Sequence, residues 1–174
     1  MRRSCIFLMC LSCLASVSSA DNGTRVGQQV DSFRLRDHRG TFRSLNDLAD
    51  RITVIAFLGT ECPLAKLYGP RLATLHSEYR ARGVAFVGIN SNAQDANTEI
   101  AAYARRHGIE FPMLKDSGNR VADQMSAVRT PEVFVLDADR RVRYWGRIDD
   151  QYGVGFVRSQ PKRQDLRYAI DELL

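Results

Sequence analysis

Two uninterrupted apolar runs dominate the pattern of hydrophobic and polar positions along the chain. Residues 52–58 and 84–89 contain almost only apolar side chains, many of them β-branched, and such runs are typical of strands buried on both faces of a sheet. Between them, apolar residues recur at helical spacing over residues 63–82, until Gly83 ends the pattern. The pattern therefore predicts two parallel strands joined by a helical crossover. The apolar stripe expected on this helix consists of Leu64, Leu67, Leu72, Leu75 and Tyr79.

Shorter segments on either side complete the expected fold. Before the crossover, residues 32–36 and 41–45 are typical of two weak strands around a turn that contains Gly40. After it we expect helices at 95–107, 119–127 and 165–174, strands at 111–114, 133–136 and 142–145, and an irregular loop at 151–163. Strands that alternate with helices and end in a hairpin predict an α/β fold. It has a central mixed sheet flanked by helices, with an N-terminal β-hairpin extension.

The N-terminus has the three parts of a secretory signal peptide. Arg2 and Arg3 form a short basic start, residues 5–14 are mostly apolar, and residues 16–20 are small and end at Ala20. The apolar run is too short for a membrane-spanning helix. We therefore expect residues 1–20 to be removed and the protein to be exported, to a periplasm or to the outside of the cell. The alternatives are a buried or membrane-lying helix, or a lipid attached at Cys13, which would bring this segment close to a membrane.

Length and composition bound the class of protein. The chain has 174 residues, of which 44% are hydrophobic and 26% are charged, the balance of one soluble globular domain. We place that domain at residues 21–174. Because Arg2 and Arg3 leave with the signal peptide, the net charge falls from +5 to +3. This small excess is spread along the chain and gives no reason to expect nucleic acid as a partner.

Removal of the signal peptide also leaves a single cysteine. The other three cysteines lie in the removed segment, and Cys62 remains, so the exported chain cannot form an internal disulfide. Cys62 follows a predicted buried strand and begins a predicted helix, where unpaired backbone N–H groups favour a thiolate. Lys66 one turn on adds a positive charge, whereas Glu61 opposes it. These features predict a nucleophilic thiol; the alternative is a small, buried and unreactive side chain.

The residues around Cys62 resemble a known active site. Residues 57–63, Phe-Leu-Gly-Thr-Glu-Cys-Pro, are similar to the strand–helix junction of thioredoxin-like proteins. The nearest subgroup is the exported redoxins, related to alkyl hydroperoxide reductase and thiol-specific antioxidant domains. Pro70 matches the kinking proline of that family's active-site helix, and residues 26–45 match the hairpin that redoxins add. The resemblance implies a thioredoxin-like fold with Cys62 as catalytic residue and a cis-proline loop packed against its thiol. The supporting residues that it implies are Thr60, Glu61, Pro63, Thr130 and Pro131.

This sequence departs from the best-known chemistries of the family that it resembles. Disulfide oxidoreductases of the family use a Cys-x-x-Cys pair, but Ala65 stands at the second position, and their buried carboxylate falls at Ala56. Peroxidases place a proline and a Thr or Ser at fixed steps before the cysteine, and Thr60 is one residue too close to it. Their activating arginine falls at Pro131, and Arg129 is two positions away. We therefore expect neither a two-thiol cycle nor the complete peroxidase constellation.

Other candidate chemistry is weaker. His38, His76 and His107 are scattered without metal-ligand spacing, so we expect surface histidines and neither a metal nor another cofactor. Four acidic residues are expected to be simple turn residues, namely Asp137, Asp139, Asp149 and Asp150. Four arginines predict a solvated basic face, since no aromatic stacking array accompanies them; these are Arg140, Arg141, Arg143 and Arg147.

Two classes of function remain. In the first, the protein is an exported thiol oxidoreductase or antioxidant enzyme in which Cys62 attacks a disulfide or a peroxide. A partner protein thiol or disulfide, or a low-molecular-weight thiol, would then resolve the mixed disulfide or the sulfenic acid. In the second, the thioredoxin-like fold serves as a binding or accessory module and Cys62 is not catalytic.

Overall fold

The structure of the protein is a computed structural model that describes residues 25–48, 51–153 and 155–174. The expected signal peptide at residues 1–20 and the candidate lipid attachment at Cys13 lie outside the described residues. Within the described ranges, no helix is both long and apolar enough to cross a lipid bilayer.

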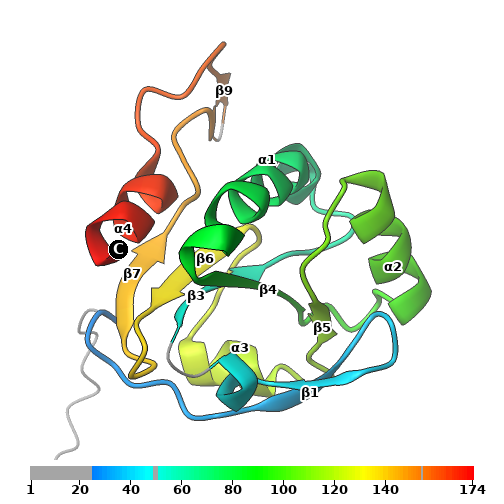
Figure 1. The fold of residues 1–174 in the computed structure, drawn as a ribbon. Coiled ribbons are helices and arrows are strands. Elements are labelled where there is room, and N and C mark those ends of the chain that lie inside the picture. Colours follow the sequence, from blue (N-terminus) through cyan, green and yellow to red (C-terminus); the bar gives the residue numbers. More distant parts are fainter. Residues whose placement is uncertain (1–24, 49–50, 154) are drawn as a thin grey trace, which may run out of the picture.

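Seven strands form one mixed sheet in the order β2-β1-β5-β4-β3-β6-β7 (Figure 1). At its centre, β3 (Ile52–Phe57) and β4 (Val84–Asn90) are parallel, and β5 (Met113–Lys115) continues the parallel part. β6 (Glu132–Leu136) is antiparallel to β3, and β7 (Val142–Gly146) is antiparallel to β6. The predicted parallel pair, the terminal hairpin and the thioredoxin-like mixed sheet are therefore confirmed.

The N-terminal hairpin extends this sheet rather than standing apart from it. β1 (Arg34–Asp37) pairs with β2 (Phe42–Ser44) as the sequence predicts. β1 also pairs antiparallel with β5, and Arg36 lies opposite Lys115. Because that second pairing joins strands far apart in the sequence, local periodicity cannot show it.

Helices cover both faces of the sheet (Figure 1). α1 (Pro63–Tyr79), α2 (Asn97–Arg106) and α4 (Asp165–Leu173) contribute to the apolar core on one face. α3 (Arg120–Met125) and the short 3-10 helix η1 (Leu45–Leu48) contribute to the core on the other face. The sheet is thus the middle layer between two cores, the arrangement expected of an α/β domain.

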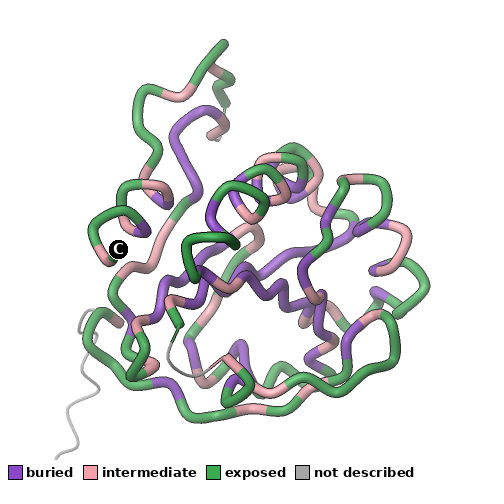
Figure 2. Tube along the Cα trace, in the orientation of Figure 1, coloured by how far each residue is buried: buried purple, intermediate pink, exposed green. Residues whose placement is uncertain are grey.

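The central strand β3 is buried along most of its length (Figure 2). Val54 and Ala56 belong to the core under α1, α2 and α4, while Ile55 and Phe57 belong to the core on the α3 side. Since successive side chains of a strand point to opposite faces, burial on both faces requires an unbroken apolar run. This is why residues 52–58 lack the alternation of a half-exposed strand.

The buried side of α1 differs from the expected stripe in its first two turns. Leu72, Leu75 and Tyr79 are buried as predicted, but Leu67 is 48% exposed. Ala65, Tyr68 and Gly69 take the buried positions in the first half of the helix instead. Helical spacing counted from residue 65 reaches 68 and 69, then 72, 75 and 79, which explains the change. The 3-10 helix η2 (Arg80–Arg82) then ends at Gly83, which has the left-handed φ of 83° that glycine tolerates.

The segment between β7 and α4 contains a small hairpin where the sequence predicts an irregular loop. β8 (Tyr152–Gly153) pairs antiparallel with β9 (Phe156–Val157), and this hairpin projects from the body of the domain (Figure 1). The ring of Tyr152 packs edge-on against Tyr68 of α1 at 5.1 Å between ring centroids. The hairpin is therefore tied to α1 at its base.

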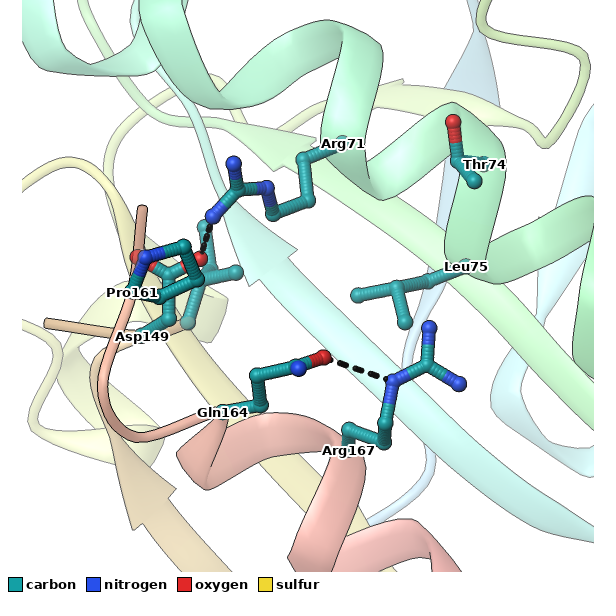
Figure 3. Close-up of a pocket in the computed structure, with 8 residues that line it drawn as sticks. Arg71, Thr74, Leu75, Asp149, Pro161, Gln164 and Arg167 are labelled. Carbon is teal, nitrogen blue, oxygen red and sulfur yellow. Dashed lines mark hydrogen bonds and ion pairs between the residues drawn. The ribbon is translucent and has the colours of Figure 1, made fainter. Parts of the chain in front are cut away.

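Asp149 and Asp150 anchor this segment, so the prediction that they are simple turn residues is wrong. Asp149 is only 1% exposed, accepts a hydrogen bond from the Tyr68 hydroxyl at 2.8 Å and pairs with Arg71 (Figure 3). The Asp150 carboxylate accepts the backbone N–H groups of Lys162 and Arg163 at 2.7 and 2.9 Å. The partners of Asp149 lie about 80 residues earlier in the chain, and those of Asp150 lie at the other end of the segment. A local turn pattern cannot reveal either set of contacts. Asp137 does serve its turn as predicted, because its carboxylate accepts the N–H of Arg141 at 2.9 Å.

Candidate active site at the end of strand β3

Cys62 lies where β3 gives way to α1. It is the N-cap residue of α1, its backbone is extended with φ −67° and ψ 119°, and Pro63 occupies the first turn. Proline is well placed there because the first N–H groups of a helix have no partner within the helix. Cys62 is half-buried and is the free cysteine of the described residues. The side chain therefore stands at the positive end of the helix dipole, as the sequence predicts.

The thiol of Cys62 contacts the loop before β6. Its Sγ donates a hydrogen bond to the carbonyl oxygen of Thr130 at 3.1 Å, and the Thr130–Pro131 peptide bond is cis. The antiparallel pairing of β3 with β6 brings these distant residues together, since Phe57 lies opposite Glu132. A carbonyl oxygen accepts a hydrogen bond only from the protonated thiol, so this contact opposes the preference of the helix N-terminus for a thiolate.

Gly59 allows the loop after β4, which carries Asn92, to approach the loop that carries Cys62. A Cβ atom added to Gly59 would lie 2.5 Å from Nδ2 of Asn92, 3.4 Å from Oγ1 of Thr130 and 3.5 Å from Cβ of Cys62. Only the absence of a side chain allows this approach. Asn92 therefore borders the candidate site, although no sequence signal singled it out.

A buried carboxylate holds the loop that carries Cys62. Asp95 is 2% exposed, and its Oδ2 accepts the backbone N–H of Thr60 at 2.9 Å and the side-chain amides of Asn90 at 2.6 Å and Asn92 at 3.1 Å. Burial opposes the charged form, but these hydrogen bonds outweigh it and hold the pKa of Asp95 below its ordinary value. An ionised Asp95 thus ties the β3–α1 loop to the end of β4.

The sequence predicts that Asp95 is the first residue of a helix, and this prediction is wrong. The helix begins at Asn97 instead, and Glu99 accepts the N–H of Ala96 at 2.7 Å. An aspartate just before a helical pattern usually caps the helix, and that signal concealed its contact with Thr60, which is 35 residues away.

The two charges next to Cys62 pair with each other. Oε2 of Glu61, whose side chain is 79% exposed, accepts a hydrogen bond from Nζ of Lys66 at 2.8 Å. The opposed influences that the sequence predicts for these residues therefore largely cancel. Thr60 is buried, and its Oγ1 has no hydrogen-bond partner among the described residues.

The first turn of α1 also rests on a buried tyrosine. The Tyr103 hydroxyl donates a hydrogen bond to the carbonyl oxygen of Ala65 at 2.6 Å. Burial raises the pKa of Tyr103 far above its usual range, and the charge of an ionised Cys62 raises it further. The hydroxyl therefore stays neutral near pH 7 and serves to position the helix that carries Cys62.

Arg129 pairs with the carboxylate of Glu132 and does not contact the Cys62 thiol. Glu132 is fully buried; it accepts hydrogen bonds from Nε1 of Trp145 at 2.6 Å and from the N–H of Val128 at 2.9 Å. Nε of Arg129 lies 3.7 Å from the same carboxylate. Because Glu132 lies opposite Phe57, it faces the α3 side of the sheet. This arrangement holds the loop before Pro131 and leaves Arg129 paired.

An open groove adjoins Thr130 on the side away from α1. It encloses about 300 Å³ and is lined by Asn92, Asn119, Val128, Arg129 and Thr130, among other residues. Val128 is 75% exposed. The groove offers room for a chain segment next to Thr130, the residue whose carbonyl contacts the thiol.

The remaining sequence candidates lie elsewhere. The three histidines are half-buried rather than superficial: His76 packs against Phe86 and Phe111, and His107 packs against Tyr103. Among the described residues, no cluster of three or more His, Cys, Asp or Glu could hold a metal ion.

The four arginines of the predicted basic face each have a partner. Arg143 pairs with Asp137, and Arg147 pairs with Asp165. Arg140 donates a hydrogen bond to Asn46, and Arg141 donates one to the carbonyl of Gly27.

Comparison with known sequences gives a family and named relatives for this chain. Residues 26–145 match a family model described as the AhpC/TSA family. The chain is 28% identical over 143 residues to a thiol-disulfide oxidoreductase ResA of Halalkalibacterium halodurans, covering 75% of this chain and 80% of the relative.

Solved structures agree on the fold. A hypothetical protein of Sinorhizobium meliloti superposes with a TM-score of 0.79 at 31% sequence identity, covering 87% of this chain and 85% of that one. A putative thiol:disulfide interchange protein DsbE of Chlorobium tepidum has a TM-score of 0.70 at 16% identity, covering 85% of this chain and 96% of that one. The latter similarity concerns the fold alone.

Proposed function

Since the chain belongs to the AhpC/TSA family, we propose that it is an exported thiol oxidoreductase that exchanges disulfides through Cys62 alone. The observation that carries this proposal is the position of Cys62 at the N-terminus of α1, with its thiol 3.1 Å from the Thr130 carbonyl beside Pro131. The relative named thiol-disulfide oxidoreductase supports the same reaction class.

The proposed reaction has three exchange steps. First, the Cys62 thiolate attacks one sulfur of a partner's disulfide; a mixed disulfide forms and the partner's other sulfur leaves as a thiolate. Second, a thiol from another protein or from a low-molecular-weight compound attacks the Cys62 sulfur, so that the partner's remaining sulfur leaves as a thiolate and Cys62 is bound to the resolving thiol. Third, a second resolving thiol attacks the sulfur of the first, releases the Cys62 thiolate and forms a disulfide between the two resolving thiols. The partner's disulfide is thus reduced by two electrons, and two resolving thiols are oxidised. A partner thiol is required because Ala65, one turn after Cys62, carries no sulfur.

Four of the five supporting residues have a structural part in this proposal, whereas Glu61 is paired with Lys66. Pro63 fixes the first turn of α1, and Thr60 links the loop to Asp95 through its N–H. Thr130 and Pro131 form the wall against the thiol, and the adjoining groove next to Thr130 would receive the partner chain. When the thiol ionises, its proton leaves the Thr130 carbonyl, which then becomes free to accept a backbone N–H of that chain.

A disulfide fits the site better than a peroxide. Cleavage of a peroxide by a thiolate releases hydroxide or alkoxide, and a nearby cation or strong donor must stabilise that anion. The two cations that the sequence offers for this role are already paired: Lys66 with Glu61 at 2.8 Å and Arg129 with Glu132 at 3.7 Å. The thiolate that leaves a disulfide is a much better leaving group and needs less stabilisation.

One observation favours a second candidate, a binding module in which Cys62 does no chemistry. The S–H of Cys62 points at the Thr130 carbonyl, and this contact stabilises the protonated, unreactive thiol. The same cis-proline loop and groove would then serve binding only. The two candidates differ in whether Cys62 forms mixed disulfides.

The experiment is to incubate the full chain with glutathione disulfide and locate adducts by peptide mapping and mass spectrometry. We expect one glutathione on Cys62, its removal by added glutathione, and no such adduct on the Cys62→Ser variant. An unmodified Cys62 in a folded chain would exclude the exchange reaction and leave the binding module. Hydrogen peroxide in a parallel sample distinguishes the substrates, since faster conversion of Cys62 to a sulfenic acid than to a mixed disulfide would favour the peroxide.

A further inference from the structure

A groove between β1 and α3 carries an unbalanced positive charge. It encloses about 620 Å³, and its lining includes Arg34, Arg36 and Arg120 as well as Phe42. All three arginines are exposed, and in the described part of the chain none has a carboxylate within ion-pair distance. We refer to this feature as the β1–α3 groove.

Two of these arginines are held in place by an aromatic ring. The guanidinium groups of Arg34 and Arg36 lie 4.2 and 4.8 Å from the ring centroid of Phe42, which is 45% exposed and lies opposite Arg36 across the hairpin. Contact with the ring orients the guanidinium groups but does not neutralise them. Lys115, by contrast, uses its ammonium on the carbonyl oxygens of Asn92 and Asp95.

A second cavity lined by arginines, between α1 and α4, lacks this property. It encloses about 260 Å³ and contains Arg71 and Arg167 (Figure 3). Arg71 pairs there with Asp149, and Arg167 pairs with Glu78 at 2.6 Å. Its charges are therefore balanced within the chain, whereas those of the β1–α3 groove are not.

We propose that the β1–α3 groove binds an acidic segment of a partner protein. Guanidinium groups that line one groove repel each other, and carboxylates bound beside them relieve that repulsion while forming paired hydrogen bonds. The exposed Phe42 ring adds an apolar contact of the kind common in protein interfaces.

The carboxylates in the groove argue for spaced acidic residues rather than a continuous polyanion. Asp31 and the buried Asp116 also line it. Asp116 uses Oδ2 to accept hydrogen bonds from Ser91 and the first N–H groups of α3, so its charge is fixed in place. Dense phosphates, as in a nucleic acid or an anionic membrane, would meet these carboxylates, whereas a peptide with neutral residues between its acids avoids them.

The β1–α3 groove lies at the same edge of the sheet as Cys62. Arg36 lies opposite Lys115, the last residue of β5, at the edge where the parallel strands end and where Cys62 follows β3. A partner bound by an acidic segment there would present a disulfide on the same edge of the sheet. That use rests on the proposed function; the binding itself requires no thiol.

The test is fluorescence anisotropy of a labelled ten-residue peptide of alternating glutamate and serine, mixed with the full chain. We expect saturable binding at low salt that weakens strongly between about 0.02 and about 0.5 M salt, as the screening length falls from roughly 20 Å to roughly 4 Å. A peptide with glutamine in place of glutamate should not bind. The Cys62→Ser variant should bind as the unaltered chain does, so a failure here and a failure of thiol exchange remain distinct results.

Matched triple variants locate the site. Arg34→Gln, Arg36→Gln and Arg120→Gln together should weaken binding about tenfold or more, since all three ion pairs with the peptide are lost at once. The control combines Arg51→Gln, Arg105→Gln and Arg106→Gln, which remove the same charge from exposed positions outside the groove. It should weaken binding less than about threefold, the share that long-range charge contributes near a surface.

Two results would overturn the proposal. Equal weakening by both triple variants would show that net charge rather than the groove attracts the peptide. Equally tight, groove-dependent binding of single-stranded DNA or of anionic phospholipid vesicles would show a general anion surface rather than a site for acidic protein segments. Far-UV circular dichroism of each variant checks that the fold is retained, as expected for exposed side chains.

Discussion

The thiol of Cys62 and the carbonyl of Thr130 are joined by a hydrogen bond of 3.1 Å, although 68 residues separate them in the chain. β3 delivers the first residue to the edge of the sheet and the antiparallel β6 begins just after the second. The contact exists only when the central strands are in register. The surroundings of the Cys62 thiol therefore differ between the folded and the unfolded chain.

Restoring a second thiol should convert this site to dithiol chemistry. The unaltered chain should reduce insulin poorly in the presence of dithiothreitol, because no neighbouring thiol can release a mixed disulfide. Ala65→Cys should increase the rate, at least severalfold, since it creates the Cys-x-x-Cys spacing on the first turn of α1. Ala65 is fully buried and small, and a cysteine is tolerated at such a position. Ala73→Cys, further along the same helix, is the matched control and should leave the rate of insulin reduction unchanged.

Rapid insulin reduction by the unaltered chain without a partner thiol would contradict the one-thiol scheme.

Asp95 should stabilise the fold in a pH-dependent way. Its pKa is lowered in the folded state, so its contribution is complete above the unfolded value of about 3.9 and is lost as the pH falls through the folded pKa. Asp95→Asn should reduce the free energy of unfolding by about 3 kcal/mol at pH 7, because an amide cannot accept from all of its donors. The difference in the free energy of unfolding between Asp95→Asn and the unaltered chain should decrease as the pH falls through the folded-state pKa of Asp95. Urea unfolding between pH 7 and pH 3 measures this, with Asp139→Asn, an exposed turn residue, as a control that should not differ from the unaltered chain.

Gly59 should be required for the approach of Asn92 to the site. Gly59→Ala places a methyl group 2.5 Å from Nδ2 of Asn92, and overpacking of this kind costs about 1–3 kcal/mol. We expect slower thiol exchange at Cys62 and a lower melting temperature. Asn92→Ala in the Gly59→Ala background should recover part of the stability, because it removes the atom that clashes. If the double variant is no more stable than Gly59→Ala alone, the clash lies elsewhere.

The N-terminal segment should be cleaved on export. Small residues before Asp21 predict cleavage after Ala20. N-terminal sequencing of the protein recovered outside the cytoplasm of an exporting bacterial host should therefore begin at Asp21. Ala20→Tyr should block the cleavage and leave the precursor, whereas Asp21→Asn should not. A mature N-terminus still at Met1 in the unaltered chain would rule out the signal peptide.

The parts of the fold that follow from local pattern could be predicted. The unbroken apolar run of β3 and the helical spacing after Cys62 are enough to predict the central crossover, and the resemblance of Thr130-Pro131 to the cis-proline loop predicts its place beside the thiol. The missed features depend on contacts between distant segments. Asp95 has the sequence context of a helix cap but binds Thr60, and Asp149 has the context of a turn but lies under α1. A buried carboxylate is recognised by its donors, and those become neighbours only when the chain is folded.

The most direct test of the central claim compares the reactivity of Cys62 in the folded and the unfolded chain. The measurement is the rate of mixed-disulfide formation with glutathione disulfide at pH 7, followed at Cys62 by peptide mapping, in buffer and in concentrated guanidinium chloride. If the N-terminus of α1 activates the thiol for exchange, Cys62 should react at least about tenfold faster in the folded chain, because helix N-termini favour the thiolate. A folded chain in which Cys62 reacts no faster than in the unfolded chain would contradict the account and leave a binding module in its place.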